Sequence, residues 1–137
     1  MPRSKGRPSA SLLEQMLGEA SWLLSHAQAL SDYGRQEETA AELARAAACE
    51  EQVACLLDAD RQELEAAIHR VSAASCYEKL RQYTRAVTLL RAALSAPLSD
   101  DYRTRVEQQL AHSLTQAHKD LRRAARNGSR KQSSTVP

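Results

Sequence analysis

AIHRVSAASCYEKLRQYTRAVTLLRAALSAP, residues 67–97, is the stretch of sequence that decides the fold. It holds two runs in which apolar or small side chains recur at steps of three and four residues, the spacing of one face of an α-helix. Leu80-Arg81-Gln82 separates the runs, and Pro97 ends the second because proline cannot continue a helix. The stretch therefore predicts a helical hairpin.

The same periodicity covers most of the 137-residue chain. Ala and Leu predominate, Phe is absent, and no β-branched run alternates with polar residues, so no strand is predicted. We expect an all-α fold of about five antiparallel helices in a single domain over residues 11–126. The first helix is predicted to start in a capping box of Ser11 and Glu14, and the third in one of Asp60 and Glu63. The other helices are predicted over about 36–57, 83–94 and from Ser99 or Asp100 to 126.

The hairpin carries a recognisable pattern of small and aromatic residues. Its members are Ala74, Tyr77, Tyr83, Ala86, Leu90, Ala93 and Pro97. This segment resembles a tetratricopeptide repeat, although Arg70, Ala73 and Arg81 depart from the usual residues. A weaker copy, which lies 47 residues earlier, comprises Ala27, Leu30, Gly34, Leu43 and Ala46. The resemblance implies stacked helical hairpins that bind a protein; a five-helix bundle that reaches the same pattern independently stays open.

Charge is distributed unevenly along the chain. The net charge is +2 in total, but residues 1–8 carry +3 and residues 119–137 carry +5, which leaves −6 for residues 9–118. We expect a basic disordered tail over 1–10 and a disordered basic, polar tail over 127–137, because neither has an apolar period.

The basic ends suggest an alternative role. Gly6-Arg7-Pro8 resembles the core of an AT-hook, a segment that lies in the minor groove of A·T-rich DNA, and arginine is favoured in narrow minor grooves. The possible nucleic-acid contacts are Arg3, Lys5, Arg7, Arg122, Arg123, Arg126, Arg130 and Lys131. The acidic body would repel DNA, so any such contact would be confined to the tails.

No motif for catalysis or metal binding emerges. The three cysteines, Cys49, Cys55 and Cys76, lack the close pairs of a zinc site and are expected to be buried free thiols. Glu65 and His69 lie one helical turn apart and are expected to form an exposed ion pair. The sequence shows neither a Gly-rich phosphate-binding loop nor a Ser/His/Asp arrangement of catalytic residues. We therefore expect no enzyme activity and no cofactor.

The sequence thus predicts a helical interaction scaffold. No stretch approaches the ~20 apolar residues that span a bilayer, so we expect no membrane association and a cytoplasmic location. The scaffold is expected to bind a protein partner, or itself as a homodimer, through a helical groove or face. The alternative is a nucleic-acid-associated factor that contacts DNA through its tails.

Overall fold

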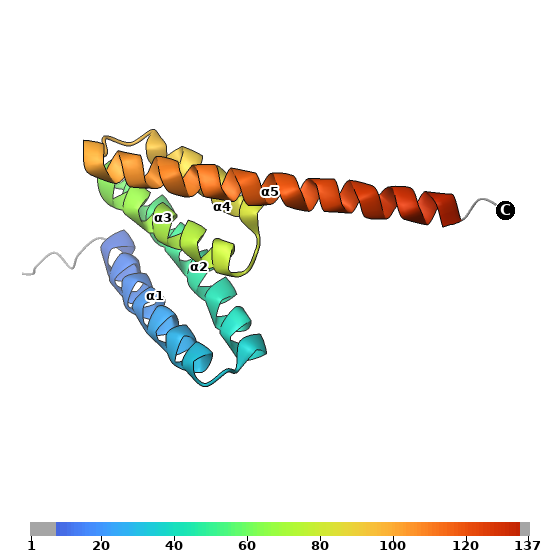
Figure 1. Cartoon of the computed structure of the whole chain (residues 1–137). Coiled ribbons are helices and arrows are strands. Elements are labelled where there is room, and N and C mark those ends of the chain that lie inside the picture. Colours follow the sequence, from blue (N-terminus) through green and yellow to red (C-terminus); the bar gives the residue numbers. More distant parts are fainter. Residues whose placement is uncertain (1–7, 135–137) are drawn as a thin grey trace, which may run out of the picture.

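The computed structural model describes residues 8–134, and the side chains of residues 11–129. These residues form five α-helices and no strand, which confirms the all-α prediction. The helices are α1 (Pro8–Asp32), α2 (Gln36–Ala59), α3 (Glu63–Lys79), α4 (Tyr83–Leu94) and α5 (Asp100–Ser134), as Figure 1 shows.

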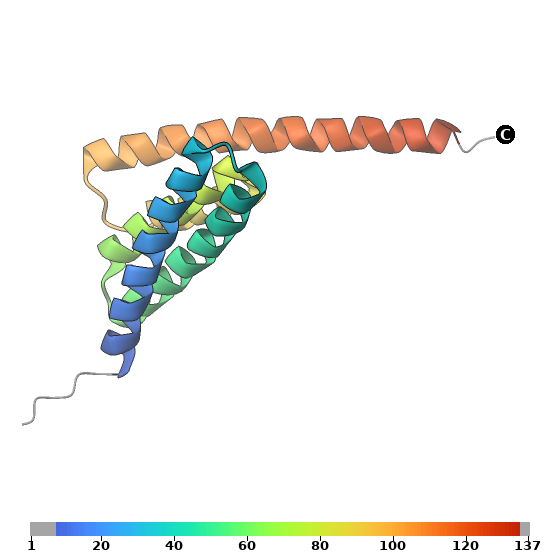
Figure 2. The same ribbon diagram turned by 90° about the horizontal axis from the view of Figure 1, so that it is seen from below.

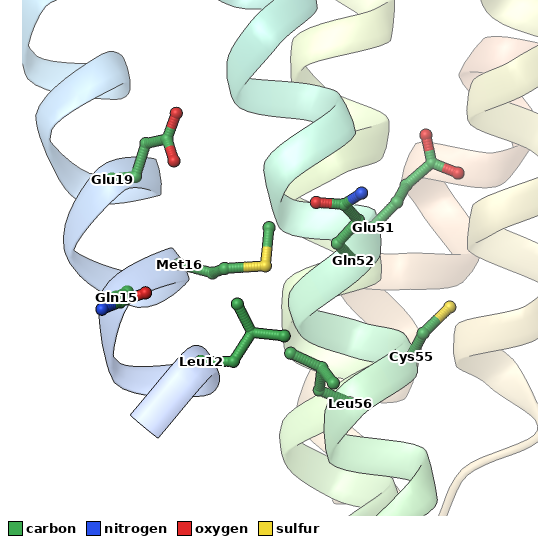
Figure 3. A pocket seen from close by; sticks show the side chains of 8 residues that line it. All are labelled: Leu12, Gln15, Met16, Glu19, Glu51, Gln52, Cys55 and Leu56. Carbon is green, nitrogen blue, oxygen red and sulfur yellow. The ribbon is translucent and has the colours of Figure 1, made fainter. Parts of the chain in front are cut away.

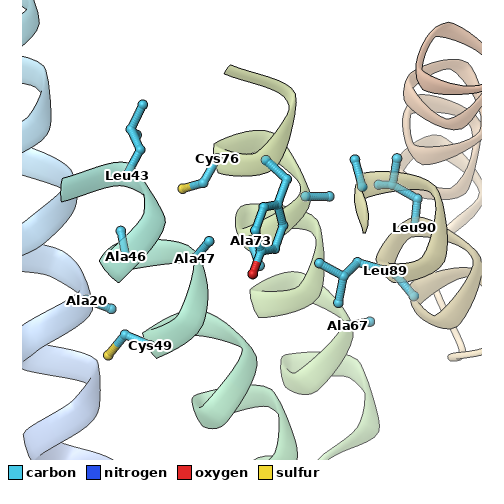
Figure 4. Packing of buried hydrophobic residues seen from close by; sticks show 14 of the residues in the cluster. Ala20, Leu43, Ala46, Ala47, Cys49, Ala67, Ala73, Cys76, Leu89 and Leu90 are labelled. Carbon is cyan, nitrogen blue, oxygen red and sulfur yellow. The ribbon is translucent and has the colours of Figure 1, made fainter. Parts of the chain in front are cut away.

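The helices pack in the order in which they follow one another along the chain. Extensive contacts join α1 to α2, α2 to α3, α3 to α4 and α4 to α5, and no other pair among the described helices is in comparable contact. One core cluster nevertheless runs through all five helices, from Leu23 on α1 to Val106 on α5. Small side chains, such as Ala20, Ala46 and Ala47, lie where neighbouring helices face each other (Figure 4). The result is a stack of helices rather than a ring around one central core.

Three turns of the same construction connect the first four helices. Each contains one residue with a positive φ, and these are Gly34 (75°), Arg61 (61°) and Arg81 (60°). In each turn the next N–H donates back to a carbonyl five residues earlier, as in a Schellman motif. These bonds are Arg35 to Leu30 at 3.0 Å, Gln62 to Leu57 at 2.8 Å and Gln82 to Tyr77 at 2.8 Å. Arg81 thus has the left-handed conformation that glycine adopts most easily.

The predicted capping box of Asp60 and Glu63 is wrong. Gln62 is the N-cap of α3 and makes no side-chain capping bond. Asp60 instead lies at the C-cap of α2, where its carboxylate accepts a 2.7 Å hydrogen bond from the Gln62 amide. The Schellman turn fixes the backbone here, so the end of α2 rather than a capping side chain sets the boundary.

The outer helices are longer than predicted. α1 starts at Pro8 rather than Ser11, since proline is favoured in the first turn of a helix. α5 continues to Ser134, although 127–137 is predicted to be disordered. Arg, Lys and Gln have helix propensities close to that of alanine, and that of Ser is only moderately lower. The single glycine at position 128 therefore does not end the helix. The remaining parts of the two predicted tails, residues 1–7 and 135–137, lie outside the described residues.

α5 divides into an anchored half and a projecting half. Val106 and Ser113 are buried against the body, whereas every residue from 118 to 129 is exposed. Figures 1 and 2 show this second half extending beyond the other helices. Arg103 anchors the first half, because its guanidinium donates to the carbonyls of Leu94 (2.9 Å) and Ala96 (3.0 Å) at the end of α4.

Candidate functional site

A hollow of about 580 Å³ borders α1 and α2. We call it the α1–α2 groove. It is lined by Leu12, Gln15, Met16, Glu19, Glu51, Gln52, Cys55 and Leu56 (Figure 3). Leu12, Met16 and Leu56 lie between the two helices in this view, so they form an apolar floor. Leu12 is 46% exposed, which leaves much of this apolar surface open to a ligand.

The groove has an acidic margin. Glu19 and Glu51 are the charged residues among the described side chains that line it, and none of these side chains is basic. Arg45 approaches Glu19 from outside at 3.8 Å, an exposed pair that solvent screens strongly. Glu51 accepts a 2.5 Å hydrogen bond from the Tyr77 hydroxyl through one carboxylate oxygen. The margin would therefore suit a ligand with apolar side chains and basic or neutral flanks.

A second hollow continues from Glu51 towards α4. It measures about 370 Å³ and is lined by Glu51, Tyr77, Arg85, Thr88 and Leu89. Burial and the hydrogen bond to Glu51 raise the pKa of Tyr77, although the Arg85 guanidinium, 5.4 Å from the ring centroid, opposes this shift. Tyr77 therefore keeps its proton at neutral pH and holds Glu51 in place between the two hollows.

Glu50, which lies next to Glu51 on α2, is buried although it is a charged residue. Glu50 is 4% exposed and its carboxylate lies 2.8 Å from Nδ1 of His69 on α3. The predicted ion pair of Glu65 and His69 is therefore wrong, because His69 turns to the neighbouring helix. A buried carboxylate needs such a partner, since isolated burial costs several kcal/mol. This polar pair fixes how α2 and α3 pack.

A similar polar contact ties α5 to α3. The Gln109 amide donates to Glu78 at 2.9 Å and to the Ser75 hydroxyl at 3.1 Å, while the buried Ser113 hydroxyl also donates to Glu78. The sequence pattern does not indicate this cluster, because the partners on α3 and α5 are 31 or more residues apart along the chain. Its role is to hold the first half of α5 in position.

The cysteines are not alike. Cys49 and Cys76 are buried, as predicted, but Cys55 is exposed at the groove, so the prediction is wrong for this residue. Burial raises the pKa of Cys76 from 9.0 to about 11, and the nearby Glu50 charge adds to the effect. Burial also raises the pKa of Cys49. Because the thiolate is the reactive form, Cys55 should react alone in the folded protein.

This difference gives a first prediction. An aromatic disulfide reagent at pH 8 should titrate one thiol in the native protein and all three after unfolding, and Cys55→Ser should remove the fast-reacting one. Fast reaction of Cys49 or Cys76 in the native protein would contradict the packing of α2 and α3.

The free energy of unfolding should also fall as the pH rises from 9.0 through about 11, because the unfolded chain ionises Cys76 before the folded chain does.

The structure brings together part of the predicted nucleic-acid contacts. Arg122, Arg123 and Arg126 are exposed on the projecting half of α5, next to Lys119. Arg130 and Lys131 belong to the last turns of the same helix, in the range where only the backbone is described. Arg3, Lys5 and Arg7 lie outside the described residues. The four described cations thus form one basic surface on α5.

The aromatic residues do not converge on one surface. Trp22 is 58% exposed and stacks on His26 of the same helix, with ring centroids 4.6 Å apart. Tyr33 lies exposed in the first turn, Tyr77 is buried, and Tyr83 meets His112 of α5 edge-on. No shared aromatic platform for a ligand forms among these described side chains.

The described residues contain neither a cluster of metal ligands nor a helix that could span a membrane. Residues 8–134 contain no group of three or more His, Cys, Asp or Glu side chains that could hold a metal ion. In that same range, no helix is both long enough and apolar enough to cross a membrane. Comparison with known proteins found no matching family, no matching characterised protein and no matching solved structure.

Proposed function

We propose that this protein is a non-enzymatic helical interaction scaffold that binds a protein partner in the α1–α2 groove. The observation that carries the proposal is the open apolar floor of Leu12, Met16 and Leu56 in a hollow of about 580 Å³. When a partner removes such an apolar surface from water, the free energy of binding becomes more favourable by ~25 cal/mol per Å² of apolar surface buried. A helix or an extended segment that inserts apolar side chains is the ligand that such a groove fits.

The repeat pattern supports the same proposal. Ala74, Tyr77, Ala86, Leu90 and Ala93 are all buried, which is what the resemblance to a tetratricopeptide repeat requires of them. In the weaker copy, Ala27, Leu30, Leu43 and Ala46 are buried as well. Repeats that stack in sequence leave extended surfaces on which partners bind. We therefore propose a divergent tetratricopeptide-like stack of two hairpins closed by α5.

The experiment uses Cys55 as a reporter at the edge of the groove. A photoreactive maleimide on Cys55 of the full chain, irradiated in an extract of the cells that make the protein, should yield one defined adduct. Leu12→Lys should abolish it, because a hydrated ammonium group on the groove floor resists the burial that binding of an apolar segment requires. Leu64→Lys is the matched control, since Leu64 is 40% exposed on α3 outside the groove, and it should leave the adduct unchanged. Equal loss in both variants, or none in Leu12→Lys, would refute the proposal.

A second candidate function is favoured by the basic surface of α5. Lys119, Arg122, Arg123 and Arg126 could contact phosphates of a nucleic acid through this exposed helix. Such binding releases counterions and must weaken steeply between about 50 and 200 mM salt. Replacing the three arginines with glutamine should then remove retention of duplex DNA. Retention that does not change with salt would exclude this function.

A further inference from the structure

The α1–α2 groove is not uniform along its length. Leu12 and Leu56 lie together at one end, whereas Glu19 and Glu51 lie towards the other (Figure 3). From Leu12 to Glu19 the chain advances by about 10 Å of helix, which is roughly two turns. A segment that binds along the groove therefore meets an apolar end and, about two turns further on, an acidic end.

Glu51 differs from its neighbour Glu50 in having no cationic partner. Glu50 lies 2.8 Å from Nδ1 of His69. Among the described side chains, Glu51 accepts one hydrogen bond, from the Tyr77 hydroxyl, and forms no ion pair. Arg85, the cation of the second hollow, lies over the Tyr77 ring instead. One carboxylate oxygen of Glu51 is therefore left for a donor from a ligand.

The Tyr77 hydroxyl holds this carboxylate in place before any ligand binds. It donates to one oxygen of Glu51 at 2.5 Å, and Tyr77 is itself buried, so the donor is fixed by the packing of α3. A side chain that is already ordered loses less conformational entropy when a ligand pairs with it. Because Glu51 lines both hollows, a long cationic side chain can reach it from a segment that lies on the apolar floor.

We propose that the groove selects a basic amphipathic segment of a partner protein, and that Glu51 is the residue that selects it. The apolar side chains of the segment cover Leu12, Met16 and Leu56. A lysine or arginine about two helical turns further along donates to the second oxygen of Glu51. This inference rests on the proposed function, of which it names the chemistry of the partner.

Other kinds of segment fit the groove less well. A neutral apolar segment would remove water from Glu51 without supplying a donor, which costs free energy. An acidic segment would bring its carboxylates towards Glu19 and Glu51, and such like charges oppose binding. The basic segment is the one that covers the floor and also pairs with the acidic end.

The charge of the whole body favours the same ligand. Residues 9–118 carry a net charge of −6, so they attract a basic segment from a distance and speed its encounter with the protein. Salt screens this attraction beyond about 10 Å at 0.1 M, and it does not depend on register. The short-range contact with Glu51 is what fixes the basic residue relative to the apolar ones.

Selection from a displayed library of random peptides of about 16 residues, roughly four helical turns, tests the partner's chemistry. The full chain should enrich peptides with a lysine or arginine about seven positions, two turns, from an apolar residue. Leu12→Lys should enrich none of them. Glu51→Gln should retain the apolar preference and lose the basic one. Glu107→Gln, which removes the same charge from an exposed site on α5, should select like the parent.

Fluorescence anisotropy with the best enriched peptide separates the roles of Glu51 and Tyr77. Glu51→Gln should weaken binding about tenfold, the effect of losing one charge-assisted hydrogen bond, and should flatten its salt dependence. Tyr77→Phe should weaken binding less, and should add no loss in the Glu51→Gln background, because Tyr77 acts through Glu51 as a positioning residue. Additive losses in the double variant would overturn that positioning role.

The outcomes distinguish this inference from the groove function on which it rests. Enrichment of apolar peptides that lack a basic residue, or an unchanged basic preference in Glu51→Gln, would overturn the inference while the groove function stands. If no enriched peptide were sensitive to Leu12→Lys, the groove function itself would fail. A rise in mass with concentration of the chain alone, abolished by Leu12→Lys, would assign the groove to a second copy and overturn the inference.

Discussion

Leu90→Ala is expected to lower the free energy of unfolding by about 2–5 kcal/mol, the range for large-to-small changes in closely packed cores. Leu90 is fully buried on α4 and belongs to the cluster that runs through all five helices. Its removal leaves a cavity that the alanine-rich surroundings cannot close, because Ala86 and Ala93 have no side-chain freedom with which to fill it. Since domains of this size are stable by only ~5–15 kcal/mol, the variant should be close to unfolding at 37 °C.

Urea denaturation followed by circular dichroism measures this effect. Leu64→Ala serves as the control, because Leu64 is 40% exposed and its removal creates no cavity. We expect the control to lose less than about 1 kcal/mol. If Leu90→Ala and Leu64→Ala lost the same free energy, α4 would not be packed as the structure has it.

Ala74→Leu tests the opposite kind of change, an addition of volume. Ala74 is fully buried on α3, within the core cluster that this helix shares with α2 and α4. Three extra carbons at such a site force neighbouring side chains or backbone to move, which costs about 1–3 kcal/mol and sometimes more. The helix propensity of leucine is close to that of alanine, so the loss would come from packing alone.

The matched control is Ala92→Leu on the exposed side of α4. Thermal and urea unfolding should show this control within about 0.5 kcal/mol of the parent. A stable Ala74→Leu protein would mean that α3 does not lie close to its neighbours, and the sequential packing of the stack would be wrong.

The helices could be predicted from the sequence to a large extent. The period of Ala and Leu predicts the right number of helices, and Gly34 and the turn at Leu80-Arg81-Gln82 lie where the structure places two of the connections. The predicted capping box at Asp60 is wrong, because a Schellman turn with Arg61 at positive φ leaves no local signature in the residue types. Strain at one residue is invisible in a hydropathy pattern.

The site was harder to predict. Glu50 follows the charged pattern of an exposed helix surface, yet it is buried because His69 meets it from the next helix. The α1–α2 groove depends on how two helices lie relative to each other, and no single helix reveals this. One contact between them joins the Cys49 thiol to the Met16 carbonyl oxygen at 3.2 Å. The exposure of Leu121 on α5 follows from the end of the body near residue 117, which the residue types of one helix do not reveal.

The proposed function depends on the α1–α2 groove. Whether a partner occupies this groove in a cell extract can be measured directly. Leu64→Cys adds a second exposed thiol on α3, away from the groove, beside the natural exposed Cys55. Alkylation rates at the two thiols, compared within one molecule, then report on groove occupancy. In an extract of the cells that make the protein, the ratio of the Cys55 rate to the rate of the introduced thiol should fall several-fold relative to the purified chain. Leu12→Lys should restore the ratio of the purified chain, whereas an identical ratio in both settings would contradict a partner in the groove.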